Sequence, residues 1–240
     1  MGQEVLRTGT PRGVGQTDVV MDIETVAVPT ESLTSEQLAY IERSKDGNEP
    51  LGDRLALHGW TCEVCTVAML NPETMKGKVL YRGKDVDRFP DLPVGWAAGG
   101  FAIDNEKGLL AETWKLLEAF SRVITYNGRG FDLPVLAQRS LVLGLSVPFN
   151  PSTYRYSFKE HLDLVEALTF FGATRRFPLG FICDALGVES PKHAMKGSDV
   201  ESRWRDGKYT EIAEYCARDV VATAALFGKV QSSLGVMLTR

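Results

Sequence analysis

The chain has little of what would place it in a membrane or a secretory pathway. None of its apolar runs approaches the length of a membrane-spanning helix, and its N-terminus lacks the apolar core of a signal peptide. The N-terminal pattern MGQEVL also lacks the Ser or Thr that N-myristoylation requires, because Leu6 occupies that position. We therefore expect a cytoplasmic protein that does not contact a membrane.

Cysteine is scarce, with four residues among 240, and most of them lie in apolar surroundings. The one close pair, Cys62 and Cys65, falls in or at the start of a predicted strand, where an offset of three sends side chains to opposite faces. No second Cys/His pair follows at zinc-finger spacing. Reduced thiols are therefore favoured over the alternative of a zinc or redox site.

Basic residues are not in excess, and the formal net charge is −4. This charge argues against non-specific coating of duplex DNA, although it leaves room for a local basic groove. A cluster of active-site carboxylates would itself make the total negative until metal binds. The contents of 44% hydrophobic and 24% charged residues are typical of a soluble globular protein.

The hydrophobic pattern and the turn residues predict alternating strands and helices. Thr34 and Gln37 have the spacing of a capping box at the start of one helix. Between two strands, NPETMKG supplies the turn residues of a hairpin. We expect strands at 19–28, 65–70, 78–82, 122–126 and 161–164, and helices at 34–43, 105–121, 132–143, 179–186, 198–206 and 209–230.

This order of elements predicts an α/β fold in which a mixed sheet has helices on both faces. Residues 1–16 are rich in Gly, Thr and polar side chains and are typical of a flexible N-terminal segment. No internal repeat or low-complexity tract divides the rest. We therefore expect one domain over residues 17–240.

The first candidate site residues are Asp22 and Glu24 in VVMDIET. Residues two apart on a strand project to the same face, and the apolar flanks are typical of a central strand covered on both sides. Two acids in such surroundings would repel each other, so a bound cation would compensate them. The alternative is a strand end that emerges into solvent.

The second candidate is Asp132 in TYNGRGFDLPVL. An Asp before a helix with Pro in its first turn is typical of an N-cap. Gly128 and Gly130, however, leave room for a ligand to approach the backbone, and Asn127 adds a donor and an acceptor. Helix N-termini also suit phosphate, so capping and ligand binding are both open for Asp132.

The third motif is EYCARDV, in which Tyr215 and Asp219 are four residues apart and share one helix face. The apolar stripe of that helix consists of Ile212, Cys216, Val220, Leu226 and Phe227. Asp219 falls within it, where a carboxylate must be protonated, paired or bound to a metal. On the opposite side we expect charged residues, among them Glu211 and Glu214.

Four further residues are weaker candidates. His161 and Asp163 share a strand face; His161 is either a hydrogen-bonded structural residue or a ligand or proton carrier, and Asp163 is a candidate support for the site. Lys192 and Lys196 lie in a predicted loop, where they are either solvated or follow a phosphate backbone.

Together these motifs resemble those of the DEDD exonuclease superfamily, which has a ribonuclease H-like fold. The Y-x-x-x-D form of the last motif is similar to the tyrosine branch, because the histidine branch would require His where this chain has Glu214. YNGRGFDLPVL, HLDL and EIAEYCARDVVAT resemble stand-alone exonucleases related to the proofreading domain of family B DNA polymerases. The resemblance covers roughly residues 17 to 230 and implies a central mixed five-stranded sheet, with no polymerase domain in this chain.

The resemblance also implies roles for the candidate residues. Tyr215 would orient the attacking water or the phosphate, because a phenol with a pKa near ~10 is a weak base. Phe131 would stack on a terminal base, with core packing as the equal alternative. Two Mg²⁺ or Mn²⁺ ions would be bound by the carboxylates of Asp22, Glu24, Asp132 and Asp219. Substrate contacts would come from Ile23, Thr25, Asn127, Phe131, Lys192 and Lys196.

The sequence therefore predicts a metal-dependent 3′–5′ exonuclease that releases nucleoside 5′-monophosphates from the 3′ end of single-stranded DNA. An exoribonuclease of the same branch is the first alternative, because no residue reports on the 2′-hydroxyl of RNA. A catalytically silent single-strand binding module is the second, and the presence of all four carboxylates argues against it.

Overall fold

The computed structural model describes residues 17–43, 50–83, 95–190 and 195–239. The expected flexible segment 1–16 and Lys192 lie outside these residues. The strands are β1 (Asp18–Ala27), β2 (Cys62–Leu70), β3 (Gly77–Arg82), β4 (Ala97–Phe101), β5 (Arg122–Thr125) and β6 (His161–Asp163). The α-helices are α1 (Ser35–Arg43), α2 (Leu51–Ala56), α3 (Glu106–Leu117), α4 (Asp132–Val142), α5 (Leu164–Leu168), α6 (Leu179–Leu186), α7 (Val200–Arg205) and α8 (Tyr209–Leu234). Short 3₁₀ helices are η1 (Thr30–Ser32), η3 (Gly197–Asp199) and η4 (Gly235–Thr239).

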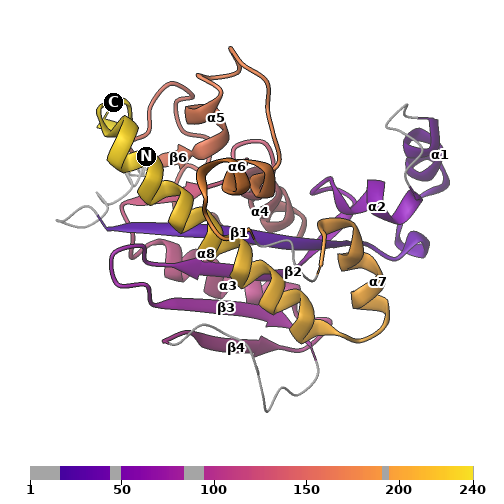
Figure 1. The fold of residues 1–240 in the computed structure, drawn as a ribbon. Coiled ribbons are helices and arrows are strands. Elements are labelled where there is room, and N and C mark those ends of the chain that lie inside the picture. Colours follow the sequence, from indigo (N-terminus) through magenta and orange to yellow (C-terminus); the bar gives the residue numbers. More distant parts are fainter. Residues whose placement is uncertain (1–16, 44–49, 84–94, 191–194, 240) are drawn as a thin grey trace, which may run out of the picture.

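The strands form one mixed sheet in the order β4-β3-β2-β1-β5-β6 (Figure 1). The pairs β1–β2 and β2–β3 are antiparallel, whereas β1–β5, β5–β6 and β3–β4 are parallel. The predicted α/β, ribonuclease H-like architecture is confirmed, but the described residues form a sheet of six strands rather than five. The extra strand is β4, whose sequence AAGGF carries two glycines and no β-branched residue, so it lacks a strand signal.

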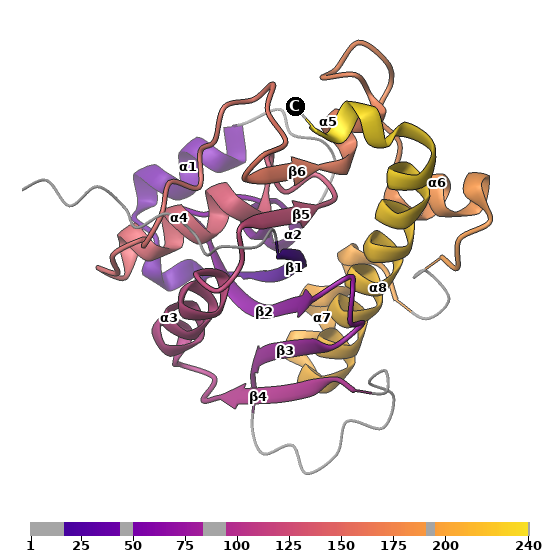
Figure 2. The same cartoon turned by 90° about the vertical axis from the view of Figure 1, so that its left-hand side faces the viewer.

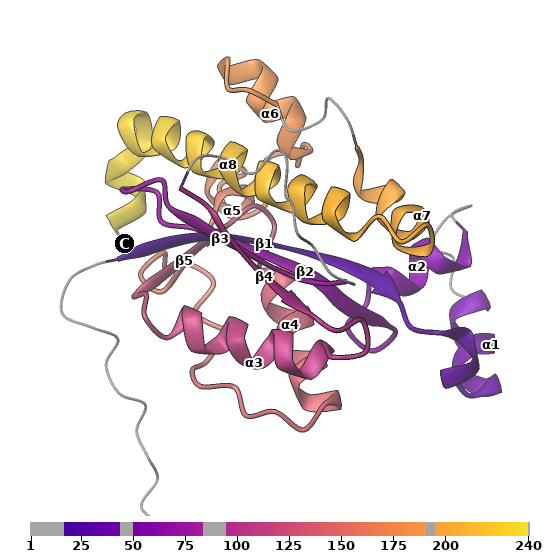
Figure 3. The same cartoon turned by 90° about the horizontal axis from the view of Figure 1, so that it is seen from below.

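Helices cover both faces of the sheet, as Figures 2 and 3 show. The long helix α8 crosses one face and contacts β1, β2 and β3, and α3 and α4 lie on the other. Each face has its own apolar core: Val20 and Ile124 belong to the cluster under α8, and Met21 and Val123 to the cluster under α3 and α4. The alternation of β1 thus sends neighbouring residues into different cores.

Helix α8 has the amphipathic pattern that the sequence indicates. Its predicted stripe is buried, and it consists of Ile212, Cys216, Val220, Leu226 and Phe227. Glu214, which we expected on the outer side, is also buried, so the covered face is broader than the pattern indicates. Together with η4, this segment is long and apolar enough to cross a membrane by length and composition, and the expectation of no such segment was too strict. Its contacts with the sheet are those of a core helix.

Helix α4 is held in place by a buried ion pair. Arg139 contacts Glu106 of α3 through two hydrogen bonds of 2.9 and 2.6 Å, and the Glu106 carboxylate also accepts the backbone N–H of Val64 in β2. Both charged side chains are almost completely buried, and their charge-assisted bidentate geometry offsets the cost of desolvation. The start of α4, where Asp132 lies, is thereby fixed relative to the sheet.

Candidate active site

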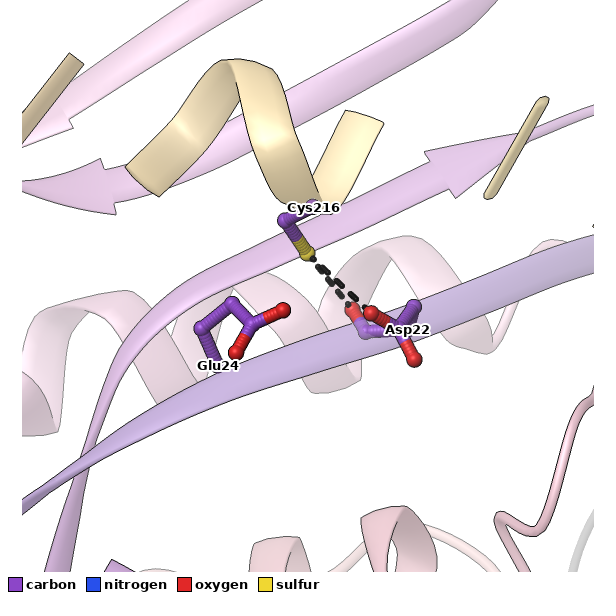
Figure 4. A group of neighbouring side chains, drawn as sticks. All are labelled: Asp22, Glu24 and Cys216. Carbon is purple, nitrogen blue, oxygen red and sulfur yellow. Dashed lines mark hydrogen bonds between the residues drawn. The ribbon is translucent and has the colours of Figure 1, made fainter. Parts of the chain in front are cut away.

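The site begins on β1, the strand that the sequence identified first. Asp22 and Glu24 are partly buried and project from the same face of β1 towards α8 (Figure 4). β5 pairs with β1 only over Asp18–Val20, so the end of β1 that carries both acids runs beyond its parallel neighbour. A register shift at Glu24 and Thr25 follows in the β1–β2 pairing. Such irregularities re-aim side chains next to active sites.

Asp132 fills the space that β5 leaves beside β1. The chain turns after β5 and enters α4 at Asp132, whose side chain is buried and lies beside the backbone of Ile23. The residue preceding α4 is Phe131, and no side-chain capping bond is formed there, so the N-cap interpretation of Asp132 was wrong. Its Oδ1 atom is buried and has no hydrogen-bond partner within the described part of the chain.

The loop before α4 is anchored by Asp163. Its carboxylate accepts the backbone N–H groups of Asn127, Arg129 and Val165 at 3.0, 2.9 and 2.8 Å. Asn127 has a left-handed backbone with φ of 71°, which Asn tolerates better than most residues. A Cβ atom on Gly128 would collide with the side chain of Thr125, so this glycine serves internal packing rather than ligand approach.

His161 is a buried structural residue beside this loop. Its Nε2 lies 2.9 Å from Thr125 Oγ1, in the strand that precedes the loop. Burial, followed by the nearby charge of Arg129, lowers the pKa of His161 to about 3. The imidazole is therefore neutral near pH ~7, which favours the hydrogen-bonded interpretation over that of a proton carrier.

Helix α8 brings Tyr215, Cys216 and Asp219 to the carboxylates of β1. The Tyr215 hydroxyl lies beside the Asp219 carboxylate, and burial, followed by the charges of Asp219, Glu24 and Asp22, raises the pKa of Tyr215. The Cys216 thiol lies 3.4 Å from the backbone oxygen of Asp22 and 3.7 Å from its Oδ2 (Figure 4). Ligand atoms of Asp22, Glu24 and Cys216 all lie within 4.8 Å of one another.

The four carboxylates act on one another electrostatically. Burial raises the pKa of Asp22, and the charges of Asp132, Glu24 and Asp219 raise it further. The pKa of Glu24 is raised by burial, then by Asp219 and Asp132, and the pKa of Asp132 is raised to about 7, chiefly by burial. Acids from β1, α4 and α8 thus share one site despite sequence separations of 132 − 24 = 108 and 219 − 132 = 87.

This donor set fits hard divalent cations. A cation would offset the repulsion among the carboxylates and give a partner to the buried Oδ1 of Asp132. The Cys216 thiol does not alter this preference, because burial and then the charges of Asp22, Glu24 and Asp219 raise its pKa. A protonated thiol is a poor metal ligand. Oxygen ligands therefore dominate the site, as hard divalent cations require.

A cleft of about 360 Å³ opens beside Glu24. Thr25 and Phe131, which the sequence suggested as substrate contacts, also line it. Thr25 donates its hydroxyl to Ala56 O at 2.7 Å, and Phe131 packs partly against the core under α3 and α4. The remaining wall comes from Asp53, Ala56, Leu57, Gly197, Ser198, Val200 and Glu201.

The structure places two further predicted substrate contacts. The side chain of Ile23 is buried in the core under α3 and α4, on the opposite side of β1 from the two acids, so only its backbone reaches the site. Lys196 is exposed and its backbone N–H is bonded to Asp199; it directly precedes Gly197 in the cleft wall.

Two features of this region were not predicted from the sequence. Cys216 was assigned only to the apolar stripe, although its position beside Tyr215 and three residues before Asp219 was a usable signal. The buried Glu166, which binds Arg155 and Arg176, was missed as well. No local pattern marks it, because its partners are 11 and 10 residues away.

Comparison with known proteins identifies the family of this chain. Residues 97–239 match the model of a family described as a predicted 3′–5′ exonuclease related to the exonuclease domain of PolB. The chain belongs to this family. The fold and the enzyme class, a 3′–5′ exonuclease domain, follow from this membership. The matched segment holds Asp132, Tyr215 and Asp219, whereas Asp22 and Glu24 precede it and join the site through the position of β1.

A curated relative supports the same assignment. The chain is 28% identical over 133 residues to DNA polymerase 1 of the archaeon Aeropyrum pernix. The match covers 51% of this chain and 14% of that protein, so the chain corresponds to a small part of its relative.

Proposed function

We propose that this exonuclease domain hydrolyses single-stranded DNA from the 3′ end and releases nucleoside 5′-monophosphates. The observation that carries the proposal is the convergence of four carboxylates from β1, α4 and α8 beside an open cleft. The name of the archaeal relative, DNA polymerase 1, supports DNA as the substrate. An exoribonuclease is the alternative, because RNA offers the same phosphodiester.

Two divalent ions, Mg²⁺ or Mn²⁺, would be held by the carboxylates of Asp22, Glu24, Asp132 and Asp219. Bound there, the ions supply the positive charge that an anionic phosphodiester needs for attack and for departure of the 3′ oxygen. The carboxylates alone would repel the substrate, so the acid cluster makes chemical sense as a metal site.

Tyr215 orients the attacking water or a phosphate oxygen, as in the tyrosine branch of these exonucleases. Its raised pKa keeps the phenol protonated, so the hydroxyl acts as a hydrogen-bond donor rather than a base. Phe131 and Thr25 line the cleft in which the terminal nucleotide would lie, and the half-buried ring of Phe131 offers a stacking face. Lys196, at the rim, follows the phosphate backbone, and Asn127 contributes polar contacts beside the loop.

The experiment that tests this function is digestion of matched 5′-labelled DNA and RNA oligonucleotides with Mg²⁺, Mn²⁺ or EDTA. We expect a ladder that shortens from the 3′ end on DNA with either metal and no cleavage in EDTA. Degradation of RNA alone would establish the alternative substrate. Binding without cleavage in every metal would instead indicate a silent binding module.

A cytoplasmic location is part of the proposal and is checked by fractionation of the native cells.

A further inference from the structure

The segment between α5 and α6 has an unusual backbone. Phe170, Phe171 and Gly172 all have positive φ, of 51°, 59° and 91°. Two consecutive phenylalanines in this region are costly, because left-handed conformations bring Cβ close to the backbone. Strain of this kind persists only where surrounding contacts enforce it, and it concentrates at functional segments.

Two arginines fix this segment by sharing one carboxylate. The buried Glu166 accepts Arg155 at 2.9 and 3.1 Å and Arg176 at 3.2 Å. The side chains of Arg155 and Arg176 remain 49% and 54% exposed. Two guanidinium groups thus face one carboxylate, so these three side chains together keep a net positive charge.

Aromatic rings continue the surface. The guanidinium of Arg175 lies 5.2 Å from the ring centre of Phe177, and Phe177 stacks on Phe181 with centroids 4.5 Å apart. Phe181 is 53% exposed, so its ring can accept a further stacking partner. Exposed cations beside exposed aromatic rings are the pattern that binds single-stranded nucleic acid.

Hydrogen bonds join this surface to the candidate active site. Tyr126 donates its hydroxyl to Phe177 O at 2.6 Å, and Arg176 donates to Asn127 Oδ1 at 3.3 Å. Tyr126 and Asn127 begin the loop that leads into Asp132. The surface is therefore continuous with the element that carries one of the four acids.

Helix α6 gives a second connection to the site. It packs against α8, and its Cys183 lies two residues from Phe181. Burial, followed by the charges of Asp184 and Asp219, raises the pKa of Cys183 to about 11, which places α6 near the acid on α8. A strand held in the site can therefore continue over α6 and the segment before it.

We propose that an arginine–phenylalanine patch, formed by Arg155, Arg175, Arg176, Phe177 and Phe181, binds the single strand on the 5′ side of the scissile linkage. The inference rests on the proposed function, since a 3′–5′ exonuclease holds the 3′ end in its site and must accommodate the rest of the strand elsewhere. The arginines contact phosphates, and Phe181 stacks on a base. Duplex DNA is a poor fit, because its bases are stacked on each other.

The test measures salt-dependent binding of a 5′-fluorescein-labelled oligothymidylate by anisotropy in EDTA, which prevents cleavage. Removing two phosphate contacts in Arg175→Ala/Arg176→Ala should reduce the slope of log affinity against log salt by ~1.4, at ~0.7 per contact on a single strand. Arg175→Ala alone, which leaves the Glu166 contacts intact, should reduce the slope by ~0.7. Phe181→Ala should weaken binding roughly 5- to 100-fold.

A matched control removes the same charge elsewhere. Lys107 and Lys115 are exposed on α3, on the opposite face of the sheet from α8, and Lys107→Ala/Lys115→Ala should leave the slope unchanged. Equal slopes for wild type and both arginine variants would overturn the inference, as would an equal loss of binding to duplex and single strand. Failure of wild-type protein to degrade any polynucleotide with Mg²⁺ or Mn²⁺ would instead overturn the proposed function.

Discussion

At the scale of single residues, the tyrosine differs from the acids around it in what it can do. Tyr215 is almost fully buried, lies beside Asp219 and has a raised pKa, so it stays protonated at the pH where the carboxylates would bind metal. A neutral phenol beside a cation site positions a water or a phosphate oxygen rather than competing as a ligand. Loss of the hydroxyl and loss of an acid should therefore have different kinetic consequences.

Tyr215→Phe keeps the ring and its packing but deletes the hydroxyl. Losing one oriented hydrogen bond in the transition state should lower the rate roughly 10- to 1000-fold, while the Mn²⁺ concentration for half-maximal activity barely changes. Asp22→Asn should lower the rate and also raise that Mn²⁺ concentration. Rate measured against Mn²⁺ concentration for both variants separates the two roles. Full activity of Tyr215→Phe on single-stranded DNA would make the tyrosine a packing residue.

Asp219→Asn should separate catalysis from stability. Its carboxylate raises the pKa values of Asp22 and Glu24, so its removal relieves repulsion in the metal-free protein. Activity should fall by at least ~100-fold because a proposed metal ligand is lost. This is more than the loss expected for a residue that only hydrogen-bonds to a ligand. The melting temperature in EDTA should stay the same or rise. Asp104→Asn, at an exposed position, is the control. A large drop in melting temperature would assign Asp219 to structure.

At the scale of elements, local patterns could be predicted and long-range placement could not. The bounds of α6 match the prediction, and the Thr34–Gln37 capping box forms, with hydrogen bonds of 2.8 and 3.2 Å. β4 was missed because AAGGF has no strand signal and takes its conformation from pairing with β3. α5 was missed because it follows β6 without a break, and α2 because it lies next to a polar stretch.

A substitution of Asp163 tests whether the loop before α4 positions Asp132 in the site. Asp163→Asn replaces one of two acceptor oxygens with a donor that faces backbone N–H groups of the loop before α4. Unsatisfied buried groups of this kind cost ~1–3 kcal/mol. The melting temperature should fall by roughly 2–4 °C for each ~1 kcal/mol, and activity should fall because Asp132 is misplaced. Asp104→Asn, at an exposed position outside the site and the arginine–phenylalanine patch, should change neither quantity. An unchanged melting temperature and activity in Asp163→Asn would show that the loop before α4 keeps its conformation without the Asp163 carboxylate.

At the scale of the whole molecule, the site exists only because distant elements meet. The spacing of Asp22 and Glu24 on a strand, and of Tyr215 and Asp219 on a helix, predicts which side chains share a face. It does not predict that β5 ends early and leaves a gap beside β1 for Asp132. Four of the five residues of the arginine–phenylalanine patch lie within residues 175–181, so their basic and aromatic character is visible in the sequence, whereas the placement of Arg155 beside them through Glu166 is not. The carboxylates converge because of the order of the strands in the sheet, and long-range packing determines that order.

The pH dependence of stability should also reveal that the carboxylates lie close together. In metal-free protein the pKa of Asp132 is raised to about 7, mainly by burial, against ~3.9 for an unperturbed Asp. Between these values the folded state binds more protons than the unfolded state, so this residue lowers the free energy of unfolding as pH rises through that window. Melting temperatures of wild type and Asp132→Asn in EDTA should therefore diverge, with wild type losing stability relative to the variant from pH ~4 to ~7. Addition of Mn²⁺ should raise the wild-type melting temperature most near pH ~7, where the carboxylates are ionised. It should stabilise Asp132→Asn less, because that variant lacks one of the proposed ligands. Parallel pH profiles for the two proteins, or equal stabilisation by Mn²⁺, would remove Asp132 from the ionised cluster and from the metal site.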